Sequence, residues 1–187
     1  ARFDDPPAEE HAYTRVIELT WDSDTRALAY YNRAEVIMRR RDISRALADY
    51  QTAADQAQDP STVAIARYGL AVAQERLGDL PAAYASLDRA SFVRLPVPPF
   101  AAEDPLDLPG LYFVPAYEEN YLRALRAMAA GHRATDPAER HDAYEIAVAE
   151  WDLYLELTPE NEPFRENARL HRARCARELD RPQTKKR

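Results

Sequence analysis

The stretch "STVAIARYGLAVAQERLGDLPAAYASLDRA", residues 61–90, decides the fold of this chain. It predicts two helices joined by a tight turn at Gly78, because glycine adopts the left-handed backbone conformation at little cost. In the second helix Ala83, Leu87 and Ala90 lie on one face, since positions i, i+4 and i+7 share a face. The small first residue allows a neighbouring helix to approach closely, and the larger ones fill the space beside it.

The same face recurs at three other places in the sequence. Each copy has a small residue, a bulky apolar residue four positions later and a third face residue three positions beyond that. The first three copies are spaced by roughly one 34-residue unit, and the fourth is separated by a unit plus an insertion. The triplets are Ala12, Val16 and Leu19; Ala46, Tyr50 and Ala53; and Ala147, Trp151 and Tyr154.

Helix-like segments precede the two middle copies. Residues 25–42 and 61–79 are such segments, and Asp24 and Ser61 or Thr62 are the expected N-caps. Residues 8–20 read either as the second helix of a repeat whose first helix is missing or as an N-terminal capping helix.

The C-terminal third of the chain is less regular. Residues 117–131 and 142–157 are expected to form a third helix pair, joined by a longer turn over 132–142. Residues 162–180 would form a C-terminal capping helix with a polar, arginine-rich outer face, as the end of a helical array requires.

The spacing resembles the tetratricopeptide repeat (TPR), a helix-turn-helix unit of about 34 residues. The pattern extends over roughly residues 8–180, and Arg33, Arg67 and Gln74 depart from it. The matching positions of the first full repeat are Tyr30, Ala34, Ile37, Asp42, Ala46, Tyr50, Ala53 and Pro60. Those of the second are Leu70, Ala71, Gly78, Asp79, Ala83, Leu87 and Ala90.

The resemblance implies an all-α protein, an α-α superhelix of antiparallel helix pairs with a proline-rich insertion. We expect a disordered segment over residues 1–7, and an N-terminal helix plus two TPR-like repeats over 8–95. A proline-rich insertion loop covers 96–116. An irregular third repeat with a capping helix covers 117–180, and a basic tail covers 181–187.

The resemblance also implies a function, that of a non-catalytic scaffold that binds a peptide or helix of a protein partner in a concave groove. One subset of the family grips carboxylates with Lys and Asn where this chain has Tyr31 and Glu35, which disfavours that ligand. An open alternative is that the Tyr and Arg residues only shield the seams between helices. The expected groove residues are Leu28, Tyr31, Glu35, Met38 and Arg39 in the first repeat, and Ile65, Tyr68, Val72, Glu75 and Arg76 in the second.

The proline-rich stretch raises a second set of hypotheses. Its prolines forbid regular helix, yet Leu111, Tyr112 and Phe113 form an apolar run that is poorly suited to water. Three roles are open for this run. It covers the exposed edges of the repeats, it occupies the groove of its own or a second copy in place of a ligand, or it is a docking surface for a partner. An alternative function is a structural subunit, a homodimer, that self-associates through residues 109–117.

Catalysis finds no support in the sequence. The four histidines have no metal-ligand spacing, although His132 and His141 flank one polar turn, and no glycine-rich phosphate loop is present. Cys175 reads as a small buried hydrophobe. We therefore expect no enzyme, no catalytic residue, no metal and no cofactor.

The charge pattern limits the remaining partners. The net charge of −7 disfavours nucleic acid, because phosphate binding requires a basic face. No apolar run approaches the roughly 18 residues of a membrane span. The arginine-rich composition, with lysine only at Lys185 and Lys186, suggests a GC-rich bacterium. The expected compartment is the cytoplasm, or the periplasm if a signal peptide was removed before Ala1.

Overall fold

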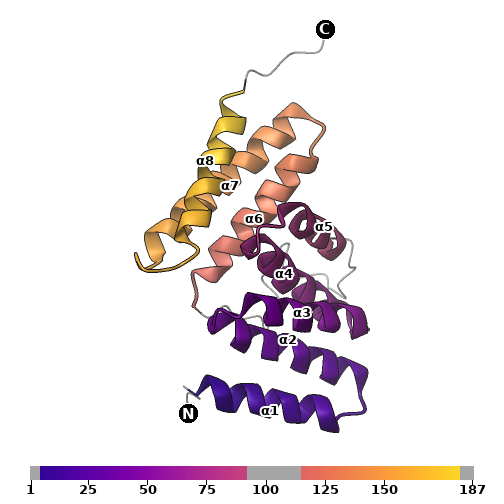
Figure 1. The fold of residues 1–187 in the computed structure, drawn as a ribbon. Helices are drawn as coiled ribbons and strands as arrows, with labels where there is room; N and C mark the ends of the chain where they lie inside the picture. The colour runs from indigo at the N-terminus through magenta and orange to yellow at the C-terminus, as the bar shows by residue number, and fades with distance from the viewer. Residues whose placement is uncertain (1–4, 92–114, 182–187) are drawn as a thin grey trace, which may run out of the picture. The chain divides into compact units, whose positions relative to one another are not determined.

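The described part of the chain, residues 5–91 and 115–181 of the computed structural model, is entirely helical (Figure 1). Consecutive helices pack as antiparallel pairs, which confirms the predicted all-α class and is consistent with a helical repeat. The described residues form eight helices: α1 (Pro6–Leu19), α2 (Ser23–Arg39), α3 (Ile43–Gln56), α4 (Pro60–Arg76), α5 (Leu80–Ser91), α6 (Glu118–Arg133), α7 (Pro137–Leu157) and α8 (Arg165–Leu179).

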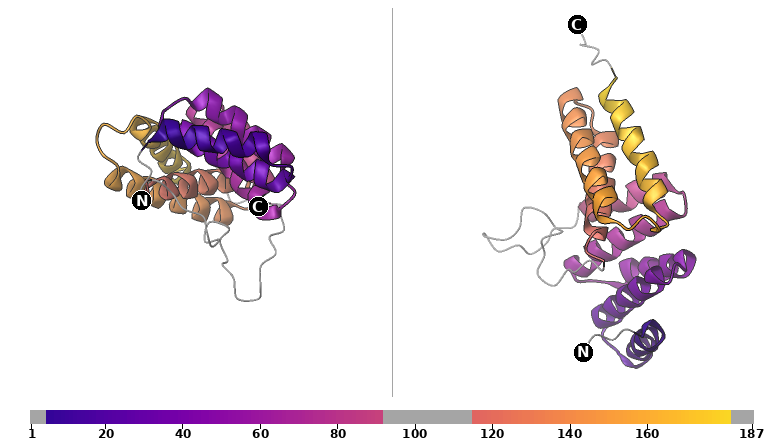
Figure 2. Two further views of the ribbon diagram at one scale, coloured as in Figure 1. Left: turned by 90° about the horizontal axis from the view of Figure 1, so that it is seen from below. Right: turned by 90° about the vertical axis from the view of Figure 1, so that its left-hand side faces the viewer.

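The helices belong to two compact units, Ala1–Pro109 and Gly110–Arg187. In the first unit each of α1 to α4 contacts the next helix, and α2 also contacts α4. In the second unit α7 contacts both α6 and α8. Figure 2 shows the helices of each unit from two further sides.

The observed N-caps lie two or three residues before the expected ones. Asp22, not Asp24, caps α2 by accepting a hydrogen bond from the Thr25 amide at 2.7 Å. Asp59 caps α4 in the same way through Thr62 at 2.8 Å. Asp24 is occupied elsewhere, because its carboxylate accepts from the amides of residues 58 and 59 and so ties the start of α2 to the α3–α4 turn.

The first helix also begins earlier than expected. Asp5 accepts a hydrogen bond from the Ala8 amide at 3.3 Å and caps α1, and Pro6 takes the first helical position. Proline fits there because its missing N–H would lack an intrahelical partner in any case. Residues 5–7 therefore belong to the α1 cap and its first turn rather than to the expected disordered segment.

The tight turn at Gly78 is confirmed. Its φ of 86° lies in the left-handed region, and its amide donates to the Glu75 carbonyl at 2.7 Å. The preceding helix pair makes the corresponding turn at Arg41, which has a φ of 67° although it is not glycine. The amide of Asp42 then donates to the carbonyl of Ile37, as the amide of the residue after Gly78 donates back to Gln74.

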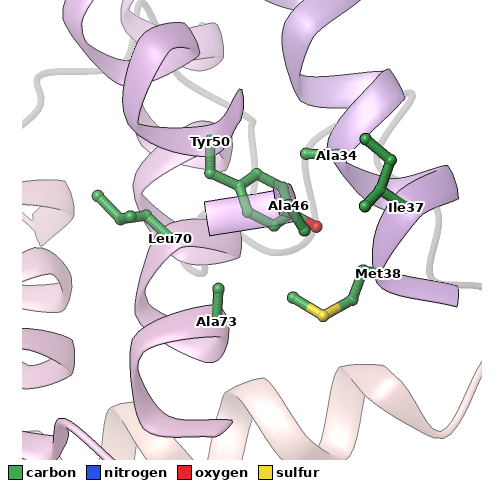
Figure 3. Packing of buried hydrophobic residues seen from close by; sticks show 7 residues of the cluster. All are labelled: Ala34, Ile37, Met38, Ala46, Tyr50, Leu70 and Ala73. Atoms are coloured by element: carbon green, nitrogen blue, oxygen red, sulfur yellow. The ribbon is translucent and has the colours of Figure 1, made fainter. Parts of the chain in front are cut away.

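The predicted faces form the core in three of the four copies. The side chains of the triplets that begin at Ala46, Ala83 and Ala147 are all at most 3% exposed. Figure 3 shows the middle of the first unit, where the Tyr50 ring lies between side chains of α2 and of α4. The cluster there consists of Ala34, Ile37, Met38, Ala46, Tyr50, Leu70 and Ala73.

The prediction of a long turn over residues 132–142 is wrong. The α6 helix continues to Arg133 and α7 starts at Pro137, so the connection is only three residues long. Asp136 caps α7 by accepting hydrogen bonds from the amides of Ala138 and Glu139 at 2.8 and 3.2 Å. Of the polar residues that suggested a loop, His132 and Arg133 thus end α6, and residues 137–142 form the solvated first turns of α7.

Candidate interaction surface on α2 and α4

The two helices that carry the predicted groove residues contact each other directly. On α2, Leu28 is 40% exposed, and Tyr31 and Glu35 are half-buried. On α4, the side chains of Ile65 and Val72 are also half-buried. These side chains form the accessible part of the predicted site.

Three of the predicted site residues lie inside the protein instead. Met38 is 8% exposed and belongs to the core cluster around Tyr50. Tyr68 and Glu75 are each 3% exposed, and Arg76 is half-buried. Sequence register placed these residues on the right helices but did not reveal their depth.

A polar cluster, which we call the Tyr31–Glu35–Tyr50 cluster, joins this part of α2 to α3. The Tyr50 hydroxyl donates a hydrogen bond to Glu35 at 2.5 Å, and the rings of Tyr31 and Tyr50 are 5.8 Å apart. Burial, followed by the negative charge of Glu35, raises the pKa of both tyrosines well above the ordinary value. Both hydroxyls therefore remain protonated and able to donate at neutral pH.

The arrangement fixes the direction of the Glu35 carboxylate. Tyr50 reaches it from α3, and the positive charge of Arg76 on α4 partly offsets the upward shift of the Tyr50 pKa. A half-buried carboxylate that is held from a neighbouring helix can accept further hydrogen bonds without first losing rotamer entropy. The surface can thus offer an ordered acceptor on the same helix as the exposed Leu28 side chain.

Two residues that support this cluster were not among the predicted site residues. Tyr50 donates the hydrogen bond to Glu35, and Gly69 leaves room for the Tyr50 ring. The Tyr50 ring packs so closely on α4 that a Cβ at Gly69 would lie 2.3 Å from its Cε1 atom. Only glycine leaves room for the ring at this distance. The aromatic position of the repeat pattern predicts the buried Tyr50 ring, but nothing in the sequence indicates that this ring packs against Gly69.

Arg39, the last predicted contact on α2, is engaged within the chain. Its guanidinium forms an ion pair with Glu9 of α1, while Glu10 of α1 pairs with Arg40 and Arg45 at 2.6 Å each. The hydrogen bond from Arg45 lowers the pKa of Glu10. Charged pairs therefore hold α1 beside α2, and a partner at Arg39 would compete with Glu9.

The remaining predicted contacts, Leu111, Tyr112 and Phe113, lie outside the described residues. Within residues 5–91 and 115–181 no group of three or more His, Cys, Asp or Glu side chains is arranged to hold a metal ion. Over the same residues, none of the helices has the length and apolar character needed to cross a membrane.

Comparisons of the chain with family models, with curated proteins and with solved structures give no match. Any inference about function therefore rests on the residues and contacts described above.

Proposed function

We propose that this protein is a non-catalytic scaffold of the TPR type that binds a peptide or helix of a protein partner on the surface of α2 and α4. The observation that carries the proposal is the direct contact of α2 with α4, next to α3, whose Tyr50 joins the Tyr31–Glu35–Tyr50 cluster to α2. In a superhelical array of this type, the neighbouring first helices of consecutive pairs would line the concave binding face.

The accessible side chains would contribute to binding in different ways. Leu28, Ile65 and Val72 supply apolar area, which drives association as it leaves water. Tyr31 contributes a rigid ring, and tyrosine is enriched among the residues that dominate interface energy. Glu35 accepts N–H groups or a cationic side chain, so the favoured ligand is an amphipathic peptide with a basic or amide donor.

Selection from a random peptide library on purified protein tests the proposal. Selected peptides should bind the intact protein and lose at least about tenfold in affinity on a Leu28→Ala/Tyr31→Ala variant, as expected when central contacts are truncated. A Glu35→Gln variant should keep apolar binding and lose the preference for a basic residue.

A Leu153→Ala variant is the matched control, because Leu153 is 44% exposed on α7 in the other unit. It should bind the selected peptides as the intact protein does. Peptides that bind the Leu28→Ala/Tyr31→Ala variant with unchanged affinity would contradict the assignment of the site to α2 and α4.

A further inference from the structure

Charged contacts, rather than buried apolar side chains, hold α1 on α2. None of the α1 residues is buried, whereas each of the other described helices contains buried side chains. The contacts of α1 with α2 and α3 include three ion pairs, of Glu9 with Arg39 and of Glu10 with Arg40 and Arg45. Ion pairs that are open to water contribute about 1 kcal/mol or less each. We therefore expect α1 to be the helix of this unit that opens most readily.

Arg39 commits little of its hydrogen-bonding capacity to Glu9. A guanidinium has five N–H donors, and in the described structure that of Arg39 donates one hydrogen bond, from Nη2 to a Glu9 carboxylate oxygen. The Arg39 side chain is 36% exposed. Arg33 differs in both respects, because it donates twice to Asp49 and once to Thr14 and is 19% exposed. Arg39 can therefore exchange one carboxylate for another, whereas Arg33 cannot do so without leaving a buried charge unpaired.

The two acidic residues at the start of α1 make different contacts. Both oxygens of Glu10 accept from an arginine, Oε2 from Arg40 and Oε1 from Arg45, so this residue ties α1 to α2 and to α3. Glu9 contacts Arg39 through one oxygen. Loss of the Glu9–Arg39 pair leaves both ion pairs of Glu10 in place. Glu9 can thus be displaced while α1 remains on α2.

Arg39 also stands in a fixed relation to Glu35, the acceptor of the candidate surface. Arg39 follows Glu35 by four residues on α2, so the two residues share a face of the helix one turn apart. Each has a different neighbour, because Tyr50 of α3 donates to Glu35 whereas Glu9 of α1 accepts from Arg39. A helix that lies along α2 meets both charges when a basic and an acidic residue are three or four positions apart in its own sequence.

We propose that the ligand of the α2 and α4 surface is a helix with a basic residue for Glu35 and, one turn away, an acidic residue that displaces Glu9 from Arg39. Glu9 is then an internal competitor, which lowers the affinity of the surface for such helices. This inference rests on the proposed function, to which it adds the second charge of the ligand and the contact that regulates its binding.

Helical peptides test this inference. They are selected on the intact protein from a library with a fixed arginine and a fixed glutamate four positions before or after it, and each is compared with an analogue that has glutamine in place of that glutamate. Glu9→Gln should raise the affinity of the glutamate peptides about threefold or more, the scale of an exposed charge pair, and leave that of the glutamine analogues unchanged. Arg39→Gln should remove the difference between the two kinds of peptide.

Glu18→Gln is the matched control, because Glu18 also belongs to α1 and also pairs with an arginine. That pair, with Arg15 at 2.7 Å, lies within α1 instead of joining α1 to α2. The variant removes the same charge from α1 and should change the affinity of neither kind of peptide. In the intact protein the carboxyl carbon resonance of Glu9 should shift when a glutamate peptide binds and stay in place when its glutamine analogue binds.

The results separate this inference from the proposed function. Peptides that bind more weakly to the Leu28→Ala/Tyr31→Ala variant but equally well to the Glu9→Gln variant and the intact protein would refute the competition and leave the site in place. Equal gains for both kinds of peptide in the Glu9→Gln variant would also refute it, because Glu9 would then act through the position of α1 instead of through Arg39. If no peptide binds, or if binding does not depend on Leu28 and Tyr31, the proposed function fails and this inference fails with it.

Discussion

Gly69 on α4 lies directly under the ring of Tyr50 on α3, so close that a methyl group at Gly69 would lie 2.3 Å from the ring. Because Tyr50 is only 1% exposed, its ring has no open space to move into. We expect Gly69→Ala to lower the free energy of unfolding by about 2 to 3 kcal/mol through overpacking. Chemical denaturation measures the change.

Gly131 on α6 provides the comparison for Gly69→Ala, because a Cβ there would lie 3.0 Å from the Tyr144 ring, a contact that small shifts relieve. Gly131→Ala should cost less than Gly69→Ala. A Tyr50→Leu change should reduce the penalty of Gly69→Ala in a double-mutant cycle. Equal penalties with and without the Tyr50 ring would mean that the clash is not the cause.

The Arg33–Asp49 pair is expected to stabilise the first unit, because both side chains are largely buried, at 19% and 11% exposed. Removing one partner leaves the other charge buried without compensation. We therefore expect Arg33→Met or Asp49→Asn to cost about 3 kcal/mol in the free energy of unfolding. A combined Arg33→Met/Asp49→Leu variant should recover part of that loss.

The pair of Arg172 on α8 with Asp152 on α7 tests the role of burial in this effect. It has the same two-bond geometry, at 2.9 and 3.1 Å, but its side chains are 43% and 51% exposed. Asp152→Asn should therefore change the free energy of unfolding by less than about 1 kcal/mol. A similar loss for the exposed and the buried pair would refute the argument from desolvation.

Sequence spacing predicted the helix pairs and three of the four faces correctly, because the i, i+4, i+7 pattern is local, but the face of Ala12, Val16 and Leu19 is exposed. The polar contacts across these faces were not predictable in the same way. Arg33 precedes Asp49 by 16 residues, whereas Gln74 and Asn120 precede their partners by 12 and 30. Which side chains meet depends on helix length and on the turn between the helices, and neither is fixed by a local pattern.

The candidate site shows the same limit. Register placed Leu28, Tyr31 and Glu35 on an accessible part of α2, but it could not tell that Met38 is buried beside Tyr50. The depth of a side chain depends on how closely the next helix approaches. That approach is set here by Gly69, which has no signature of its own in the sequence.

Arg41 occupies a turn position that favours glycine, because its φ is 67° and the equivalent turn has Gly78 with a φ of 86°. A residue with a side chain pays about 1 kcal/mol in this left-handed conformation. We expect Arg41→Gly to raise the free energy of unfolding by up to about that amount, and Gly78→Ala to lower it by about as much. Chemical denaturation of both variants measures whether the two changes in the free energy of unfolding have opposite signs.

The packing of α1 against α2 should weaken as the pH falls. The hydrogen bond from Arg45 lowers the pKa of Glu10 below its ordinary value of 4.5. A depressed carboxyl pKa contributes stability that is fully present above 4.5 and is lost as the pH falls through the lower folded pKa. Within the described structure none of the α1 residues is buried, so we expect amide protection of α1 to fall in this window before that of α3.

Nuclear magnetic resonance titration of the Glu10 side chain measures this pKa. An Arg45→Gln variant should move it back toward the ordinary value, while Arg15→Gln, on the opposite side of α1, should not. High salt should also loosen α1 at neutral pH by screening the pairs of Glu9 and Glu10. A Glu10 pKa that does not respond to Arg45→Gln would show that this arginine is not its cause.

Cys175 on α8 should report on the opening of the second unit. Burial raises the pKa of its thiol to about 12, and its side chain is fully buried. The thiolate is the reactive form, so almost none is present at pH 8. We expect the thiol to react with a disulfide reagent only as fast as α8 detaches from α7. Asp152→Asn, which removes an ion pair between these helices, should speed the reaction, whereas Arg45→Gln in the first unit should not. A rapid reaction in the folded protein would show that the cysteine is accessible.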